Sequence, residues 1–405
     1  MNNLISAKTN EKKILTITCF SHFLSHFNML VFPALVLPLS ALLGISIGST
    51  IEISFWMYLM YGLTALPWGL AADRWGAKPL LTLFHLGSAI SCFAAAFYAG
   101  SINGLAVSMM GLGIFSGIYH PAGLGLISKE TKKISRKLAV NGVFGSLGIA
   151  FAAVFAGFFN SYFGLKTVFI LLGLINLSGL FLIAGYKPVQ KPATDKKTQD
   201  TAASFLTPFI ILLCVMMLAG ICYRGSTLTI PAYFELKNND IFSMCASLTG
   251  LSLTKNLVAT LSTTIILMAG IIGQLFGGRL AEKFDLRFCY ICMHLVIIPV
   301  AFLMAKTANF PLIVLGMLYF FFLLGTQPIE NTLVAKLTPK RFLSTAYGLK
   351  FIFTFGVGAL SVKAIKQIET SFGIENIFTF LGIVSMILVS VIGLLILVTS
   401  KHNIR

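Results

Sequence analysis

The residues of this chain that could do chemistry are a few ionisable side chains inside long apolar runs. His22 and His26 stand four residues apart in one run, so on a helix they share a face. They could bind an anionic group or titrate near neutral pH. A zinc site is another possibility, although no carboxylate accompanies the two histidines on that helix. A further alternative is that both histidines only form hydrogen bonds to neighbouring helices. We favour substrate binding, because an ionisable group at the bilayer centre costs about 3 kcal/mol, and we predict no metal site.

Arg224 and Glu330 are the charged candidates. Arg224, preceded by Tyr223, can clamp a carboxylate or phosphate with two parallel hydrogen bonds. The alternative is an internal ion pair with Glu330 or Glu235. Glu330, in QPIEN, is the only carboxylate well inside an apolar run. Burial there favours the neutral form of the carboxyl group, and a positive neighbour favours the charged form. We predict proton coupling for Glu330; a static pair with Arg224 or Lys336, or a position already reached by water, is the alternative.

A third candidate is His120, in the run GIFSGIYHPAG at residues 113–123. Pro121 leaves carbonyls of the preceding turn unpaired, and neighbouring polar groups can use them. We therefore predict that His120 joins His22, His26, Tyr223 and Arg224 in substrate binding. Lys350 is expected to extend to the cytoplasmic surface, and a position lining the cavity is the alternative. Lesser candidates are Gln274 and Glu52. His85 and His294 lie close to the ends of their helices, so we expect no functional role for them.

The elements that position these residues must be membrane helices. Hydrophobic residues make up 57% of the chain and charged residues 11%, against roughly a quarter charged in soluble domains. The net charge of +17 would suggest nucleic acid in a soluble chain, but these charges occupy loops between apolar runs, so we exclude it. The seven cysteines are scattered, and Cys289-x-x-Cys292 has no second pair to complete a metal or redox site.

A bilayer-spanning helix needs about 20 mainly apolar residues, and on that basis the chain is an all-α membrane protein with twelve spans. The first is a retained helix, since its apolar run continues without a signal-peptide cleavage site. The polar stretch 187–205 predicts a cytoplasmic linker between two six-helix bundles, residues 1–186 and 206–405. The spans are expected near 14–38, 51–72, 79–99, 103–127, 138–159, 166–186, 206–234, 256–281, 286–305, 311–335, 344–366 and 375–399.

The orientation follows from the basic residues. Most of the 30 Lys and Arg residues fall in the two tails and in alternate loops, which places both termini in the cytoplasm. The membrane is then the inner or plasma membrane. The outer loops hold only Lys166, Lys237, Lys255, Lys306, Lys363 and Lys366.

Internal repetition joins the two bundles. The stretch GLAADRWGAK, Gly69 to Lys78, returns in degraded form as GRLAEKFDLR, Gly278 to Arg287. The prolines of the fourth and tenth spans, Pro121 and Pro328, also match, which aligns His120 with Gln327. Matching Pro33 to Pro231 aligns His26 with Arg224. Repeats of this kind place a binding site at their interface near the midplane.

The first copy, with Gly69, Asp73, Arg74, Gly76 and Lys78, resembles the signature loop of the major facilitator superfamily of secondary transporters. The second keeps Gly278 and Arg287, with Glu282 for the Asp and Asp285 for the second Gly. The resemblance implies two pseudo-symmetric six-helix bundles, a monomer, alternating access, and a conformational latch at these loops, comprising Gly69, Asp73, Arg74, Gly76, Lys78, Glu282 and Arg287.

Two further resemblances bear on direction. The His-Pro pair at His120 is similar to that of fosmidomycin-resistance-type exporters, which implies export. The fifth span carries Gly142, Gly145 and Gly148 but lacks the central Pro of the antiporter signature, which leaves uptake open and favours a packing role for these glycines.

The sequence thus predicts a proton-coupled transporter, not an enzyme, without cofactors or a P-loop. A cavity bearing three histidines and Arg224 against Glu330 favours a solute with a carboxylate, phosphonate or hydroxamate group over lipophilic cations. The alternatives are an uptake permease for an organic anion or metal chelator, and a transporter-like sensor without flux.

Overall fold

The computed structural model describes residues 2–131, 134–186, 206–250, 253–338 and 343–400, and every regular element within these ranges is helical. The predicted linker, residues 187–205, lies outside the described residues. The helices before it are α1 (Asn2–Ala34), α2 (Val36–Leu43), α3 (Ile47–Glu52), α4 (Phe55–Leu63), α5 (Ala65–Trp75), α6 (Ala77–Phe97), α7 (Ile102–Ser116), α8 (Tyr119–Glu130), α9 (Ile134–Phe163) and α10 (Leu165–Ala184).

The helices after it include one irregular stretch. Between α16 and α17 the chain forms a π-helical segment, η3, and a 3₁₀ turn, η4, within one apolar span, Ala346–Phe372. The elements are α11 (Leu206–Lys237), α12 (Asn239–Thr249), α13 (Lys255–Lys283), α14 (Leu286–Met304), α15 (Asn309–Lys336), α16 (Leu343–Phe351), η3 (Ile352–Gly356), η4 (Val357–Ala359), α17 (Leu360–Phe372) and α18 (Asn376–Val398).

Helix length and composition confirm the all-α membrane fold. In the described part of the chain, eleven helices are long and apolar enough to cross a bilayer, and a bent pair adds a twelfth. The bent pair is Val36–Leu43 with Ile47–Leu63, which meet at 108°. The prediction of one continuous helix near 51–72 is wrong, since α3, α4 and α5 divide this stretch. The hydroxyls of Ser54 and Thr64 donate to carbonyls in the preceding turn, at 2.6 and 2.7 Å, which favours bending at both breaks.

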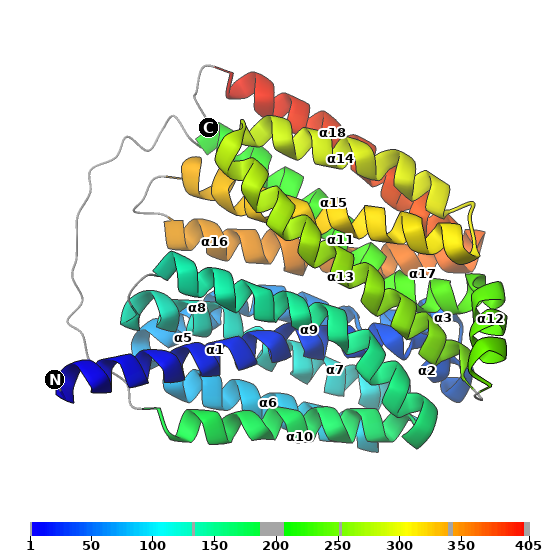
Figure 1. The fold of residues 1–405 in the computed structure, drawn as a ribbon, viewed down its shortest axis with the longest axis horizontal. Helices are drawn as coiled ribbons and strands as arrows, with labels where there is room; N and C mark the ends of the chain where they lie inside the picture. The colour runs from blue at the N-terminus through cyan, green and yellow to red at the C-terminus, as the bar shows by residue number, and fades with distance from the viewer. Residues whose placement is uncertain (1, 132–133, 187–205, 251–252, 339–342, 401–405) are drawn as a thin grey trace.

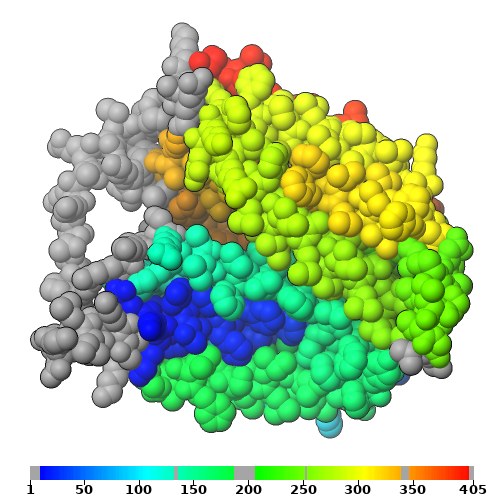
Figure 2. Space-filling model, in the orientation of Figure 1, coloured from blue at the N-terminus to red at the C-terminus, as the bar shows by residue number. Residues whose placement is uncertain are grey.

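The first ten helices and the last eight lie on opposite sides of a central interface (Figure 1). On the face shown in Figure 2 the two halves meet along α9 and α13, and α1 also packs against α11. Helix α1 begins and α18 ends at the same end of the molecule, which we call the open end. The opposite end, with α2, α3, α12 and α17, we call the closed end (Figure 1).

The glycines of α9 bring helices of the first half close together. A Cβ on Gly148 would lie 2.2 Å from the carbonyl oxygen of Phe23 in α1, and a Cβ on Gly145 would lie 2.6 Å from the His22 ring. Packing is therefore confirmed as a role for these two glycines. Gly142 has nothing within 4 Å of such a Cβ, so close packing is not its reason. The consequence is that α9 forms a wall directly behind the histidines of α1.

Candidate functional site: a cavity between the two halves

A cavity of about 1040 Å³ lies between the halves and reaches the open end between α5 and α8 on one side and α15 and α16 on the other. Five of the six residues predicted to bind substrate or couple protons line it: His22, His26, His120, Tyr223 and Glu330. Helices from both halves therefore converge on a single chamber. Arg224, the sixth, lies beyond the lining.

The three histidines of the first half form one cluster. The ring centroids of His22 and His26 lie 5.0 Å apart, and that of His120 lies 5.2 Å from each. Their nearest potential ligand nitrogens all lie within 4.8 Å of one another. Four-residue spacing on α1 supplies the first two, and the break between α7 and α8 brings the third. The sequence predicted that all three histidines take part in substrate binding, but only the contact between His22 and His26 could be predicted from spacing along one helix.

Each buried ring of the cluster is held by a partner on another helix. His22 Nδ1 lies 2.8 Å from the backbone oxygen of Asn141 in α9. His120 Nε2 lies 2.9 Å from the hydroxyl of Tyr61 in α4, which also contacts Ser25 at 3.1 Å. Tyr61 was not among the predicted site residues, although a tyrosine in an apolar run is a polar signal. These contacts fix the orientation of both rings.

The second half covers the histidines with aromatic residues from α16 and η3. The Phe351 ring lies 4.7 Å from that of His120, and Phe355 stacks on His120 with the planes 14° apart. Widened π-helical turns are frequent at functional sites because they redirect side chains. Here the widened turn places Thr354 and Phe355 on the cavity wall.

Arg224 lies in α11 with only 2% of its surface exposed. Its guanidinium carbon stands 3.7 Å above the ring of Tyr58 in α4, a cation–π contact that joins the two halves. Nε and Nη1 have no hydrogen-bond partner among the described residues. The alternative of an ion pair with Glu330 or Glu235 is not realised, because Glu235 accepts from Asn256 at 2.8 Å and Glu330 has other partners. Arg224 therefore keeps donors available.

Glu330 is held by two residues that the sequence did not pair with it. The Tyr290 hydroxyl donates to Oε1 at 2.7 Å, and Lys350 Nζ lies 3.3 Å from Oε2. Lys350 also donates to Asn331 at 2.6 Å and is only 7% exposed. The expectation that Lys350 extends to the surface is wrong, since its ammonium group is drawn to the buried carboxylate. The alternative of a static ion pair between Glu330 and Lys336 is not realised, since Lys350 is the lysine that pairs with Glu330.

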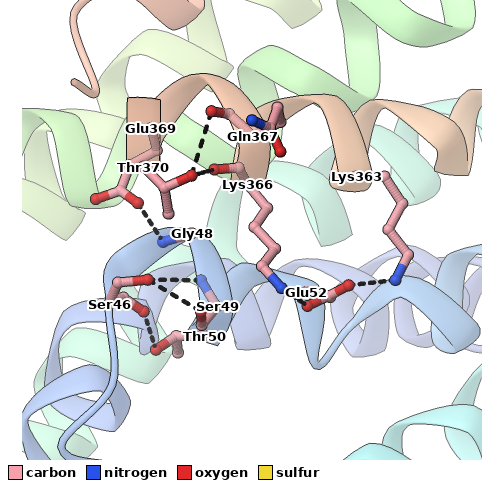
Figure 3. A network of polar contacts seen from close by, with 10 residues as sticks. All are labelled: Ser46, Gly48, Ser49, Thr50, Glu52, Lys363, Lys366, Gln367, Glu369 and Thr370. Atoms are coloured by element: carbon pink, nitrogen blue, oxygen red, sulfur yellow. Dashed lines mark hydrogen bonds and ion pairs between the residues drawn. The ribbon is translucent and has the colours of Figure 1, made fainter. Parts of the chain in front are cut away.

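The closed end is held by polar contacts between the halves (Figure 3). Glu52 of α3 accepts from both Lys363 and Lys366 of α17. The backbone N–H of Gly48 donates to Glu369 at 2.9 Å. A Cβ on Gly48 would lie 2.6 Å from that carboxylate and 3.0 Å from the backbone of Lys366, so glycine favours this close approach. The cavity is thus sealed at this end and open at the other.

The two copies of the predicted latch share a fold but differ in bonding. Lys78 donates to the backbone oxygen of Tyr186, beyond the last helix of the first half, at 2.7 Å. Arg287 donates likewise to Thr399, beyond the last helix of the second half, at 2.5 Å. Gly76 reverses the chain with φ 82°, where the second copy has Asp285 as the N-cap of α14.

The acidic residues of these loops also differ. Asp73 pairs with Lys129 of α8 at 2.6 Å, an exposed contact within the first half. Arg287 donates to Asp285 and holds the pKa of that carboxyl below its usual value. A Cβ on Gly69 would lie 3.5 Å from Pro121, and a Cβ on Gly278 would lie 4.0 Å from Pro328. Arg74 and Glu282 are exposed. The latch role of these loops stays a prediction.

Two helical halves around a central cavity that is open at one end define a transporter. The sequence model of the Major Facilitator Superfamily matches residues 18–262 and 241–405, so the chain belongs to that superfamily. It is 25% identical over 387 residues to the "Multi-drug resistance efflux pump PmrA" of Streptococcus pneumoniae serotype 4, covering 91% of this chain and 92% of that protein.

Solved structures show the same fold at low identity. A POT family transporter in complex with a thioalcohol-conjugated peptide matches with a TM-score of 0.73 and 16% identity, covering 96% of both chains. The nucleoside transporter NupG matches with a TM-score of 0.73 and 15% identity, covering 95% of this chain and all of that one. These likenesses show the fold alone.

Proposed function

We propose that this protein exports a small organic anion in exchange for protons across the inner or plasma membrane, with both termini in the cytoplasm. The open end then faces the cytoplasm, and the structure represents an inward-open state. A solute enters from the cytoplasm, binds between the halves, and leaves when the open end closes and the closed end parts.

The charge distribution around the cavity carries the choice of an anion. Arg224 is buried with two guanidinium nitrogens unpartnered among the described residues, and burying such a group without partners is costly. The carboxylate of Glu330 already has Lys350 and Tyr290 as partners. A lipophilic cation would therefore meet positive charge without a free carboxylate at the centre, whereas a carboxylate or phosphonate would satisfy Arg224.

Substrate contact by Arg224 requires a local rearrangement, because it is not on the cavity wall. Its neighbour Tyr223 lines the cavity, and the aromatic residues of η3 lie beside Tyr223, with a centroid distance of 6.5 Å to Phe355. Movement of η3 would open the way to the guanidinium group. Such movement accompanies alternating access, because η3 packs against α4 of the opposite half.

Proton coupling is proposed at Glu330. Its carboxylate forms an ion pair with Lys350 of α16 and a hydrogen bond with Tyr290 of α14. Protonation removes the ion pair and releases α16, which lines the cavity between the halves. Exchange requires that the predicted latch loops at the open end close over the solute while Glu330 is ionised. Glu330 then takes up a proton from the outer side after the solute has left, and the solute-free protein carries that proton back to the cytoplasmic side. The resemblance to efflux pumps and the His-Pro pair support export.

The experiment is a measurement of luminal pH in proteoliposomes of known orientation. Organic anions and lipophilic cations are added separately on the cytoplasmic side. A pH change with anions alone, with protons moving against the solute, is the expected result. Protons moving with the solute would mean uptake, and a response to cations alone would overturn the anion assignment. Silence across a broad anion panel would favour the sensor alternative.

A further inference from the structure

We propose that His22, His26 and His120 bind one divalent transition-metal ion, of the Zn²⁺ or Co²⁺ type, with an open coordination position toward the cavity. The inference deepens the proposed function, because the ion would hold the anionic group of the solute. It reverses the expectation from sequence that no metal binds. The reason is the third histidine, which spacing along α1 could not place.

The geometry of the cluster suits three imidazole ligands. The candidate nitrogens lie within 4.8 Å of one another, and a tetrahedral ion with Zn–N bonds of about 2.1 Å holds its ligands about 3.4 Å apart. Closing the difference takes ring shifts of roughly an ångström. His26, the most exposed of the three, has room to make them. No comparable group of three ligands occurs elsewhere in the described ranges.

The hydrogen bonds of two of the rings prepare their free nitrogens for a metal. The backbone oxygen of Asn141 can only accept, so His22 Nδ1 carries the proton and Nε2 of the neutral ring keeps its lone pair. Metal-binding histidines characteristically donate their other N–H to such a partner. His120 uses Nε2 toward Tyr61, and its buried Nδ1 has no partner among the described residues. His22 thus has Nε2 available, and His120 offers Nδ1 in the tautomer in which its Nε2–H donates to the Tyr61 hydroxyl.

The charge of the metal ion indicates that its fourth ligand would be an anionic group. Three neutral imidazoles leave the full double positive charge on the ion, and the described lining offers no carboxylate within this cluster. Imidazole ligands favour Zn²⁺, Co²⁺, Ni²⁺ and Cu²⁺ over Mg²⁺ and Ca²⁺. The open position would therefore take a carboxylate or hydroxamate oxygen of the solute. Arg224 and Lys350 lie on the facing half, where they can bind remaining acidic oxygens.

Cobalt binding to the purified, tag-free protein tests this directly, because it needs no transport. Wild-type protein should bind one Co²⁺ per chain, with the visible absorption of a tetrahedral nitrogen site, and Zn²⁺ should displace it. His26→Gln should weaken Co²⁺ affinity tenfold or more, and Tyr61→Phe, which removes the partner of His120, about tenfold. His85→Gln is the matched control, since His85 is a buried histidine bonded to Ser21 outside the cluster, and it should bind like wild type.

Absence of saturable Co²⁺ binding by monodisperse wild-type protein would overturn the inference, as would unchanged binding by His26→Gln. Adding acetate to the cobalt form should shift its spectrum, and an unchanged spectrum would overturn the open position. The proposed function fails separately: if Co²⁺ binds as expected but anions move no protons in proteoliposomes, the metal site stands without the exporter. If chelator-stripped protein still exchanges anions for protons, the exporter stands without the metal.

Discussion

The two walls of the cavity come from related helices but carry different chemistry. The first half presents three imidazoles, two of them held by hydrogen bonds to neutral partners, His22 to Asn141 and His120 to Tyr61. The second half presents charges, with Glu330 and Lys350 paired at the wall and Arg224 buried behind it. The difference teaches that an internal repeat conserves helix placement while each half takes a separate role. We assign solute coordination to the first wall and charge recognition and proton coupling to the second.

The largest expected effect comes from removing the buried charge of the second half. Arg224→Ala should abolish anion transport, because losing one partner of a buried charged contact costs about 2–5 kcal/mol, or thirtyfold and more in affinity. Arg224→Lys should retain part of the activity, since it keeps the charge without the two-pronged geometry. The measurement is solute flux in proteoliposomes, with folding checked by gel filtration. Full flux in Arg224→Ala would remove this residue from the site.

The next effect should separate binding from coupling. Glu330→Gln keeps the hydrogen bond with Tyr290 in reach but removes the charge that Lys350 pairs with. We expect solute exchange to continue while accumulation no longer responds to a pH gradient. Glu235→Gln is the control, because Glu235 bonds Asn256 and lies away from Lys350. Intact gradient-driven accumulation in Glu330→Gln would end the coupling assignment.

A smaller effect is expected at the closed end, where the halves are joined. Glu52→Gln removes two ion pairs across the interface, each worth about 0.2–1 kcal/mol for partly exposed groups. The closed end should open more often, by about threefold to tenfold. Hydrogen exchange should become faster in α3 and α17 and slower around α5 and α8.

Glu375→Gln provides the matched control for that comparison. Glu375 pairs with Lys237 at the same end, at 2.5 Å, but both residues belong to the second half. Its removal should change exchange only near the ends of α11 and α18. Equal exchange changes in both variants would mean that contacts between the halves have no special role in holding this end closed.

The helices and most polar residues of the cavity could be predicted from the sequence, because membrane burial restricts both. Long apolar runs must span the bilayer, and ionisable residues within them are few because their burial is costly. The partners of those residues could not be predicted from the sequence. Lys350 and Tyr290 meet Glu330 only because α14, α15 and α16 converge, and periodicity along one helix carries no information on its neighbours. The divided second span was missed because Ser54 and Thr64 bend it locally.

The same limit applied to the histidines. His22 and His26 could be paired from their spacing on one helix, whereas His120 lies about a hundred residues away and joins them through packing of α8 against α1. A three-ligand site therefore could not be predicted from any local pattern. The repeat offered no help, since its alignment matches His120 with Gln327, a residue that bonds Gln274 instead.

The last effect concerns stability and not transport, and it comes from the two loop copies. Arg287 contacts Thr399 and Asp285 in a largely buried position, so Arg287→Ala should destabilise the protein by about 2 kcal/mol. Lys78→Ala removes one hydrogen bond to Tyr186 and should cost less. Thermal unfolding of the purified variants measures both. A larger loss for Lys78→Ala would contradict the expectation that the second copy, with more hydrogen bonds, contributes more to stability.

Acid should reduce the loss of stability caused by Arg287→Ala, because part of that loss depends on the charge of Asp285. Arg287 lowers the pKa of this carboxyl below its usual 3.8, so the pair stabilises the folded state above about pH 4. As the pH falls through the lowered pKa, Asp285 takes up a proton and that contribution disappears. The gap in melting temperature between wild type and Arg287→Ala should therefore shrink below about pH 4. It should not close, because Arg287 keeps its two bonds to Thr399 whatever the charge on Asp285.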